Sequence, residues 1–337
     1  MTAPTENELK FFHSEERSAL STNGGRLSTT EIISGALNNV WPHVLRAERT
    51  AGSTMYRKVA LKVHQDGNGS LASTEFVIDG PTLGDDRVIM FAATATDTQA
   101  DITGSERIYC AGGLASPITA GSQTIVFAVK DAADAAGVQV GDDIRLTDKL
   151  TPSSTTGNVE YHTVATKSVS GLNVTITTED LITNAYAAWS SGSGGKVGVI
   201  RAAGATIASH GTIVKTSAAG IFDNTIYPIL FNNMGADEHS ITLTFTDATH
   251  FTAASDRFGA LATGIITSDY APLHPTWNKP LLTIELEAWG GTWAGGDTLV
   301  IPLHACAAYN WEKRIVPAGC NPLSNNRVIL VNRSEGV

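Results

Sequence analysis

The side chains best suited to chemistry gather in the last quarter of the chain. Glu285 and Glu287 stand two residues apart in an expected strand, which puts both carboxylates on one face, and Trp289 and Trp293 follow closely. Carboxylates beside tryptophan are typical of a sugar-binding or glycosidase surface. Two carboxylates on one strand do not flank a substrate from opposite sides, so we favour a solvated strand face with aromatic edges. Trp289 and Trp293 stay candidates for an aromatic interface or a glycan contact.

A second candidate is a polar turn in which Asp66, Asn68 and Ser70 alternate like the oxygen ligands of a calcium loop. Leu71 occupies the position of that loop's turn glycine, and Val77 occupies the position of its bidentate glutamate. A hairpin turn therefore explains these residues better than a metal site does.

Other catalytic and metal-binding patterns are missing from the sequence. The nine histidines show no His-x-x-x-His spacing, and the cysteines form no Cys-x-x-Cys pair, so nothing indicates zinc. No Gly-x-Ser-x-Gly elbow occurs, and the glycine run at 192–195 lacks the Lys-Ser/Thr of a phosphate loop. We therefore expect a protein that is not an enzyme and that binds no metal and no cofactor.

The composition excludes several classes of protein. The 337 residues are 42% hydrophobic, which is enough for a packed core and excludes global disorder. No apolar run reaches the ~18 residues of a membrane span, and the N-terminal stretch lacks the apolar centre of a signal peptide. Cys110, Cys306 and Cys320 are too few for a disulfide framework and suit a reducing cytoplasm. We expect no membrane partner and synthesis in a cytoplasm.

Alternating apolar and polar residues, rich in Val, Ile and Thr, predict a mostly β chain. Short helices are expected over 28–37, where Ser28 and Glu31 form a capping-box pattern, and near 131–137. The expected strands are 55–63, 73–80, 86–91, 123–130, 143–148, 160–170, 173–178, 225–231, 239–247, 281–289 and 297–305.

The chain also resembles itself. Residues 55–79 and 226–247 both read as a Tyr, an apolar strand, a Gly-containing turn and a Thr-rich strand that ends on Asp. In the same order, 84–94 parallels 296–305, and 105–113 parallels 312–320. Three matches in one order favour an internal duplication over reused turn and strand patterns.

These observations predict two related β-barrel or sandwich units, a small inserted β domain and an extended N-terminal arm with one short helix. The expected ranges are 1–54 for the arm, 55–113 for the first unit, 114–200 for the inserted domain and 201–337 for the second unit.

Charge is placed unevenly along the chain. Residues 1–62 carry a net charge of +2 and the remainder carries −12, within a chain that is only 17% charged and has 32 glycines. An acidic body repels nucleic acid, because gripping phosphates requires clustered Lys and Arg. The simpler interpretation is solubility.

Four segments carry a resemblance to a known family: 16–28 (ERSALSTNGGRLS), 38–42 (NNVWP), 48–59 (ERTAGSTMYRKV) and 311–319 (WEKRIVPAG). The text resembles structural proteins from the tail-morphogenesis region of Mu-like, transposable tailed phages and related prophages. The resemblance extends over nearly the whole chain, although Cys110 stands where the family pattern has Gly.

The resemblance implies a virion address, in the tail, and among tail components the duplication favours the major tail protein of a long, flexible tail. Such tubes are stacked rings of six tube-like units, so the chain would form a trimer with pseudo-hexameric rings, or a hexamer. Its other partners would be the tape measure and terminator proteins, with double-stranded DNA only in transit. Arg46, Arg49, Arg57 and Lys58 are candidates for ring-to-ring contacts. The alternatives are a baseplate or distal-tail protein and a carbohydrate-binding tail protein.

Overall fold

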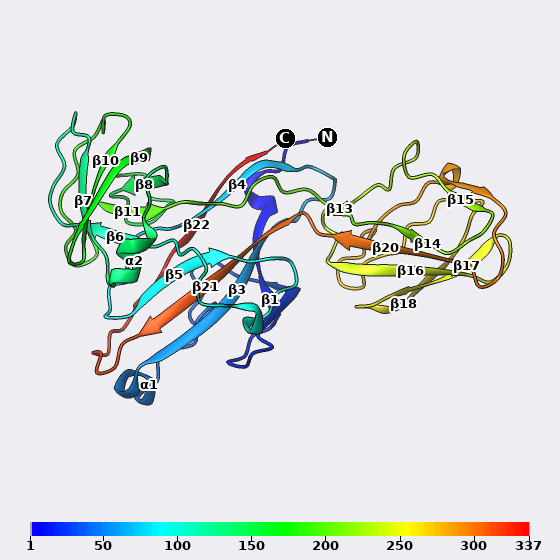
Figure 1. Ribbon diagram of the computed structural model, residues 1–337, viewed down its shortest axis with the longest axis horizontal. Helices are drawn as coiled ribbons and strands as arrows, with labels where there is room; N and C mark the ends of the chain where they lie inside the picture. The colour runs from blue at the N-terminus through cyan, green and yellow to red at the C-terminus, as the bar shows by residue number, and fades with distance from the viewer. Residues whose placement is uncertain (1, 337) are drawn as a thin grey trace.

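The computed structural model describes residues 2–336 and confirms a mostly β chain, with 44% strand and 6% helix. Three β bodies follow one another along the longest axis of the molecule (Figure 1). A closed barrel forms one end, two packed sheets form the centre, and a second pair of sheets forms the other end; we call these the barrel, the central body and the C-terminal sandwich.

The central body packs a five-stranded sheet on a three-stranded one. Leu61, Val88 and Met90 of the larger sheet share a buried core with Phe76 and Ile78 of the smaller. The larger sheet has the order β2 (Gly24–Glu31), β1 (Leu9–Glu16), β3 (Ser53–Val63), β21 (Ala307–Val316) and β5 (Arg87–Ala92). The smaller sheet consists of β12 (Arg201–Ala202), β4 (Leu71–Ile78) and β22 (Leu330–Gly336), and the short helices beside these sheets are η1 (Glu6–Glu8), α1 (Arg46–Ala51) and η2 (Gln99–Asp101).

The barrel closes because each of its six strands pairs with two neighbours. Alternate side chains such as Val174 and Ile176 point inward and are fully buried. The order is β10 (Asn173–Thr178), β7 (Thr124–Ala128), β6 (Ala111–Leu114), β11 (Lys196–Val199), β8 (Asp143–Thr147) and β9 (Val159–Ser170). The predicted helix near 131–137 is confirmed as α2 (Ala132–Gly137), which the Asp131 carboxylate caps by accepting a hydrogen bond from the Ala133 N–H.

The C-terminal sandwich has the cleanest alternation in the chain. Ile241, Leu243 and Phe245 are buried, and the residues between them are half-buried. Its larger sheet contains β13 (Ser209–His210), β14 (Val214–Lys215), β20 (Thr298–His304), β16 (His239–Phe245), β17 (His250–Ser255) and β18 (Gly259–Ile265). A small sheet of β15 (Gly220–Phe222) and β19 (Trp289–Gly291), the latter preceded by η3 (Leu286–Ala288), covers one side of it.

The predicted helix over 28–37 is wrong, and much of 1–54 pairs as β1 and β2 instead of forming an extended arm; the short helix of this segment is α1, at Arg46–Ala51. Residues 24–31 form β2, which pairs with β1, and Leu27 is 1% exposed. Ser28 and Glu31 therefore lie in a strand and do not cap a helix, because tertiary contacts override weak local helix signals.

Two predicted strands, 225–231 and 281–289, are absent. Near 225–231, the Asp223 carboxylate accepts from the N–H groups of Thr225 and Ile226, and Asn224 accepts from Ile229, so the backbone turns. The stretch 281–289 makes only isolated bridges, at Thr283 and Ile284, before η3.

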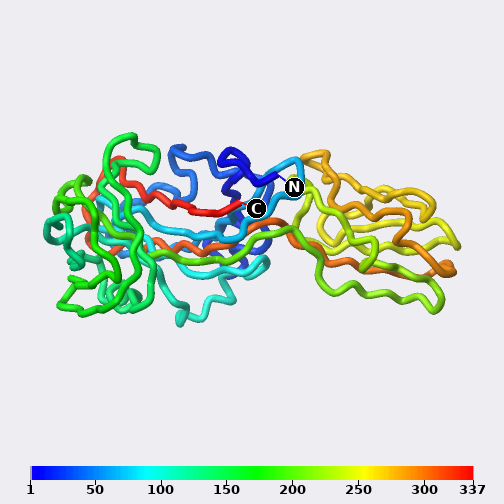
Figure 2. Tube along the Cα trace, turned by 90° about the horizontal axis from the view of Figure 1, so that it is seen from above, coloured from blue at the N-terminus to red at the C-terminus, as the bar shows by residue number. Residues whose placement is uncertain are grey.

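The strand pairing crosses the predicted boundaries. Residues 55–79 do not form a hairpin, because β3 and β4 belong to different sheets. β21 and β22, which were assigned to the unit 201–337, complete the sheets of β3 and β4, whereas the barrel strands run from Ala111 to Val199. Figure 2 shows the C-terminal strand lying along the central body. No helix within residues 2–336 is long and apolar enough to cross a membrane.

Candidate functional site

The predicted aromatic site is part of a core. Trp293 is 1% exposed and stacks on Phe245 with ring centroids 4.1 Å apart, so the prediction of a glycan contact or interface is wrong for this residue. Trp289 is half-buried against Phe222 and Phe251. Glu285 immediately precedes η3 and Glu287 lies within it, so the two carboxylates do not share a strand face as was predicted.

Two of the four predicted ring-to-ring residues lie inside the central body. The Lys58 ammonium lies 2.6 Å from an Asp97 carboxylate oxygen and donates to the Gly25 carbonyl, and its side chain is 1% exposed. Arg57 is buried and donates to the Ser18 carbonyl. The prediction of an intermolecular contact is therefore wrong for these two, because their partners are in their own chain. Arg46 and Arg49 lie in the exposed helix α1, and their role stays a prediction.

Buried charges gather where the barrel meets the central body. The Asp79 carboxylate, at the end of β4, is fully buried between the Arg145 guanidinium of β8 and the Lys196 ammonium of β11, 2.9 Å away. Burial, together with the charge of Arg145, lowers the pKa of Lys196 to about 8. β11 also needs Gly198, since a Cβ there would lie 2.3 Å from the Ile78 carbonyl oxygen.

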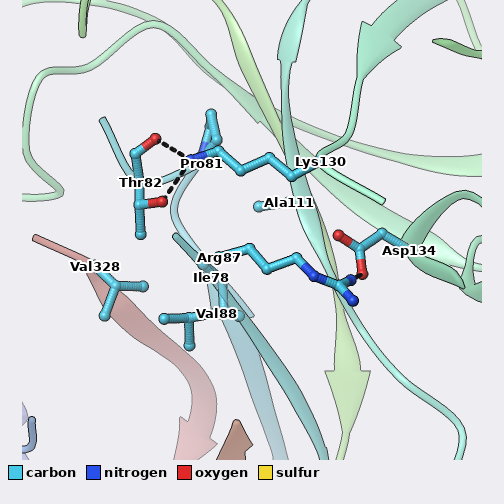
Figure 3. Close-up of a pocket in the computed structure, with 10 residues that line it drawn as sticks. Ile78, Pro81, Thr82, Arg87, Val88, Ala111, Lys130, Asp134 and Val328 are labelled. Carbon is cyan, nitrogen blue, oxygen red and sulfur yellow. Dashed lines mark hydrogen bonds and ion pairs between the residues drawn. The ribbon is translucent and has the colours of Figure 1, made fainter. Parts of the chain in front are cut away.

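A small cavity at the same junction is filled by a lysine (Figure 3). The Lys130 ammonium donates to the Thr82 carbonyl at 2.8 Å, to the Thr82 hydroxyl at 2.6 Å and to the Asp86 carbonyl at 2.7 Å. Arg87 pairs with Asp134 beside it, and burial raises the pKa of Asp134 to about 6. The enclosed volume is about 10 Å³, room for about one water. This site therefore holds a loop in place and admits no larger ligand.

A second buried network joins the C-terminal sandwich to the central body. Asp237 lies 2.6 Å from the Arg257 guanidinium and 3.3 Å from His274 Nε2, and its side chain has no exposed surface. Burial opposes ionisation of Asp237, but the hydrogen bond from His274 and the charges of Lys62 and Arg257 lower its pKa overall. Lys62 is fully buried, donates to the Ala236 carbonyl and lies 4.1 Å from the centre of the Trp277 ring.

Glu238 extends this network toward β21. Its carboxylate accepts hydrogen bonds from the Ala305 N–H at 2.9 Å and from the Tyr309 hydroxyl at 3.0 Å, and lies 3.1 Å from His304 Nδ1. Burial, followed by the nearby Glu238 charge, raises the pKa of Tyr309 well above its usual value. These contacts tie the residue before β16 and the end of β20 in the sandwich to β21 of the central sheet.

The residue types of the second network could serve acid–base chemistry, but its geometry does not. Asp237 and His274 form a carboxylate–imidazole pair, yet both side chains are 0% exposed, so no substrate reaches them. A nearby pair, Ser255 Oγ and His239 Nδ1 at 2.9 Å, is buried as well. Among residues 2–336 no group of three or more His, Cys, Asp or Glu side chains could hold a metal ion.

One groove is large enough for a ligand but carries no chemistry. It measures about 450 Å³, runs beside β18 and is lined only by apolar side chains: Phe258, Ala260, Leu261, Ala262, Ala271, Pro272, Leu273 and Pro275. The lining has no titratable group and no nucleophile.

Glu312 is a buried acidic residue of the central body. It lies on β21 opposite Arg57 of β3, is 3% exposed and forms no ion pair with any residue between 2 and 336. Burial raises its pKa to about 7. A folded-state pKa above the unfolded value means that the folded state holds the proton more tightly, so stability falls as the pH rises from about 4.5 to about 7.

Glu312→Gln is therefore expected to remove this loss of stability. The free energy of unfolding of the unmodified chain should fall by about 2–3 kcal/mol relative to the variant between pH 5 and pH 8. Urea unfolding at several pH values measures the difference, and the exposed Glu287→Gln is the control. Parallel pH profiles for the unmodified chain and Glu312→Gln would contradict the expectation.

No family model, curated protein or solved structure matches this chain. What the fold and the buried networks define is a class: a mostly β chain of three bodies whose described ionic clusters hold its own parts together. Sequence reasoning did not single out Asp79, Asp237, His274 or Lys196, because each looks like an ordinary polar residue at a strand end or in a loop.

Proposed function

We propose that the chain is a virion structural protein that assembles with copies of itself into the stacked rings of a phage tail tube. The observation that carries the proposal is the use of charge: the buried clusters around Asp79 and Asp237 join the β bodies, and the groove beside β18 is lined by apolar side chains. A non-catalytic building block needs such rigid internal junctions and no accessible polar site. The resemblance of four sequence segments to tail proteins supports the same conclusion.

The finer part of the proposal is that two related β units in one chain make a three-chain, pseudo-hexameric ring. Its support is architectural, since the central body and the C-terminal sandwich each pair a large antiparallel sheet with a small one. The shared sequence pattern does not form matching hairpins, so a six-chain ring is the alternative within the same function.

The acidity of the chain suits a conduit for DNA. Residues 203–306, which include the whole C-terminal sandwich, have nine Asp and Glu and only three Lys and Arg. A surface of that sign repels phosphates and would let double-stranded DNA pass without being held. The tape measure and terminator proteins would be its other partners in the tail.

Electron microscopy of the purified chain at high concentration tests the proposal. We expect rings or short tubes with threefold symmetry, or with sixfold symmetry if each chain supplies one unit. In virions the chain should rival the capsid protein in copy number. Low copy number would instead favour a baseplate or distal-tail protein, and a compact monomer at every concentration would contradict self-assembly. The alternative of a carbohydrate-binding tail protein loses its main support because Trp293 is buried.

A further inference from the structure

Apolar and polar contacts together form the junction between the C-terminal sandwich and the central body. The chain crosses it between β12 and β13 and again between β20 and β21. The buried side chains Val63, Leu71, Ala208, Ala236 and Cys306 form an apolar cluster there, and Leu9 and Phe231 pack against it. The charged groups at the same junction add contacts whose strength depends on protonation.

Ion pairs cross this junction on its outer side. Arg26 of β2 lies 2.5 Å from Asp256, and Lys279 lies 2.5 Å from Asp66. Arg257 reaches back to Glu15 of β1 at 2.9 Å as well as to Asp237. The pairs Arg26–Asp256, Lys279–Asp66 and Arg257–Glu15 each join the central body to the sandwich. The Asp237 carboxylate holds the Arg257 guanidinium in place.

Inside the junction, imidazole and aromatic rings alternate in one continuous row, which we call the ring stack. The centroids of His64 and Trp277 are 4.9 Å apart, those of Trp277 and His274 are 4.2 Å apart, and those of His274 and Phe258 are 4.9 Å apart. Phe258 then contacts His239 at 5.2 Å. The stack begins just after β3 of the central body and ends at the start of β16 in the sandwich.

Charged groups face the ring stack from both bodies. Around His64 these are Lys62, Lys10 and Glu31, with His274 across the stack. Around His239 they are Asp237, Asp256, Arg257 and Arg26. The cations Lys62 and Arg257 already lie over the rings of Trp277 and Phe258, so protonated imidazoles would add positive charge beside existing positive charge.

The pKa values of two histidines and two aspartates at this junction are all lowered. Burial lowers the pKa of His64 and that of His239 to about 4. Hydrogen bonds from Lys279 and Asn232 lower the pKa of Asp66, and bonds from Ser240 and Arg26 outweigh burial to lower that of Asp256. The docked arrangement thus holds fewer protons than separated bodies would, and its stability falls as the pH drops below about 6.5 toward 4.

We propose that this junction is an acid-sensitive contact: mild acid releases the C-terminal sandwich from the central body while both keep their own folds. The barrel stays attached under the same conditions. At its junction, burial raises the pKa of Asp134 to about 6, so acid relieves a cost there instead of adding one, and Lys196, with a pKa of about 8, takes up its proton largely above the acidic range. The inference concerns a conformational change in a single chain and holds whether or not the chain forms a tube.

Small-angle X-ray scattering and tryptophan fluorescence of the full chain between pH 7.5 and pH 4 test this proposal. As the pH falls, we expect the scattering curve to require a wider range of molecular shapes. The far-UV circular dichroism signal should stay native over the same range. Neutralisation should restore the starting scattering curve. The fluorescence of the unmodified chain minus that of Trp277→Phe isolates the indole in the ring stack, and it should change over the same pH range.

Variants place the effect at named groups. His64→Gln with His239→Gln should lower the midpoint of the transition by at least about half a pH unit, because two protonation sites are removed. Asp66→Asn, a surface change, should raise the midpoint, since an ion pair across the junction is lost, and it serves if the double variant does not fold. His250→Gln, at an exposed turn beside Asp247, is the matched control and should leave the midpoint unchanged. No transition down to pH 4, loss of the far-UV signal together with the Trp277 signal, or an unmoved midpoint in Asp66→Asn would overturn the proposal.

Discussion

Asp237→Ala is expected to lower the free energy of unfolding by about 3–5 kcal/mol, since removing one member of a buried ionic cluster leaves the other charges without compensation. Asp237 is the fully buried acid between Arg257 and His274, with the Lys62 ammonium nearby. Alanine would leave Arg257 with only Glu15 as an ionic partner. The C-terminal sandwich should lose its attachment to the central body before its own core unfolds.

Urea unfolding followed by circular dichroism measures this loss. Asp247→Ala is the control, because that carboxylate is 56% exposed and its contacts, with Thr249 and His250, stay within one surface turn, so its loss should cost much less than the loss of Asp237. Equal effects of the two substitutions would show that the buried network contributes no more than a surface pair.

Trp293→Ala should cost a similar amount, about 3–5 kcal/mol, for a different reason. The indole lies in the centre of an aromatic cluster, stacked on Phe245 and 5.7 Å from Trp289. The Gly220 backbone packs directly on the indole ring, since a Cβ at Gly220 would lie 2.5 Å from it. Alanine leaves a cavity that the two sheets of the sandwich cannot close without moving.

Thermal unfolding and near-UV circular dichroism should both register the loss of this ring. Leu286→Ala, 42% exposed in the same body, is the comparison and should change stability little. An unchanged melting temperature in Trp293→Ala would mean that the ring is free, and would restore Trp293 as a candidate for contact with glycan or with another chain.

Burial alternates along some of the strands that were predicted correctly, and runs almost unbroken along others such as β3 and β5. In β16 and β20 every second residue enters the core, so the period of two is visible without any knowledge of the partner strand. The helix α2 was also predicted from a local signal, because its capping residue Asp131 is adjacent to it in the sequence. The predictions failed at 28–37 and at 225–231, where pairing with β1 in one case and side-chain hydrogen bonds in the other decided the backbone.

The buried ionic networks could not be predicted from the sequence, because their residues are far apart along the chain. Lys196 and Asp79 are separated by 117 residues, and Lys62 and the Ala236 carbonyl by 174. A lysine inside an alternating strand pattern reads as solvent-facing, and nothing local marks Lys58 or Lys62 as buried. Arg57 and Lys58 were candidates for ring-to-ring contacts, and the packing of the five-stranded sheet buries both of them.

The sequence by itself determined that this protein is mostly β, since side-chain alternation, β-branched content and turn residues are local properties of the chain. Only the tertiary structure decided which strands pair, where β21 and β22 belong, and which charges are buried. Strand pairing and burial depend on groups that the fold brings together from distant positions, and their energy comes from desolvation and charge at those contacts.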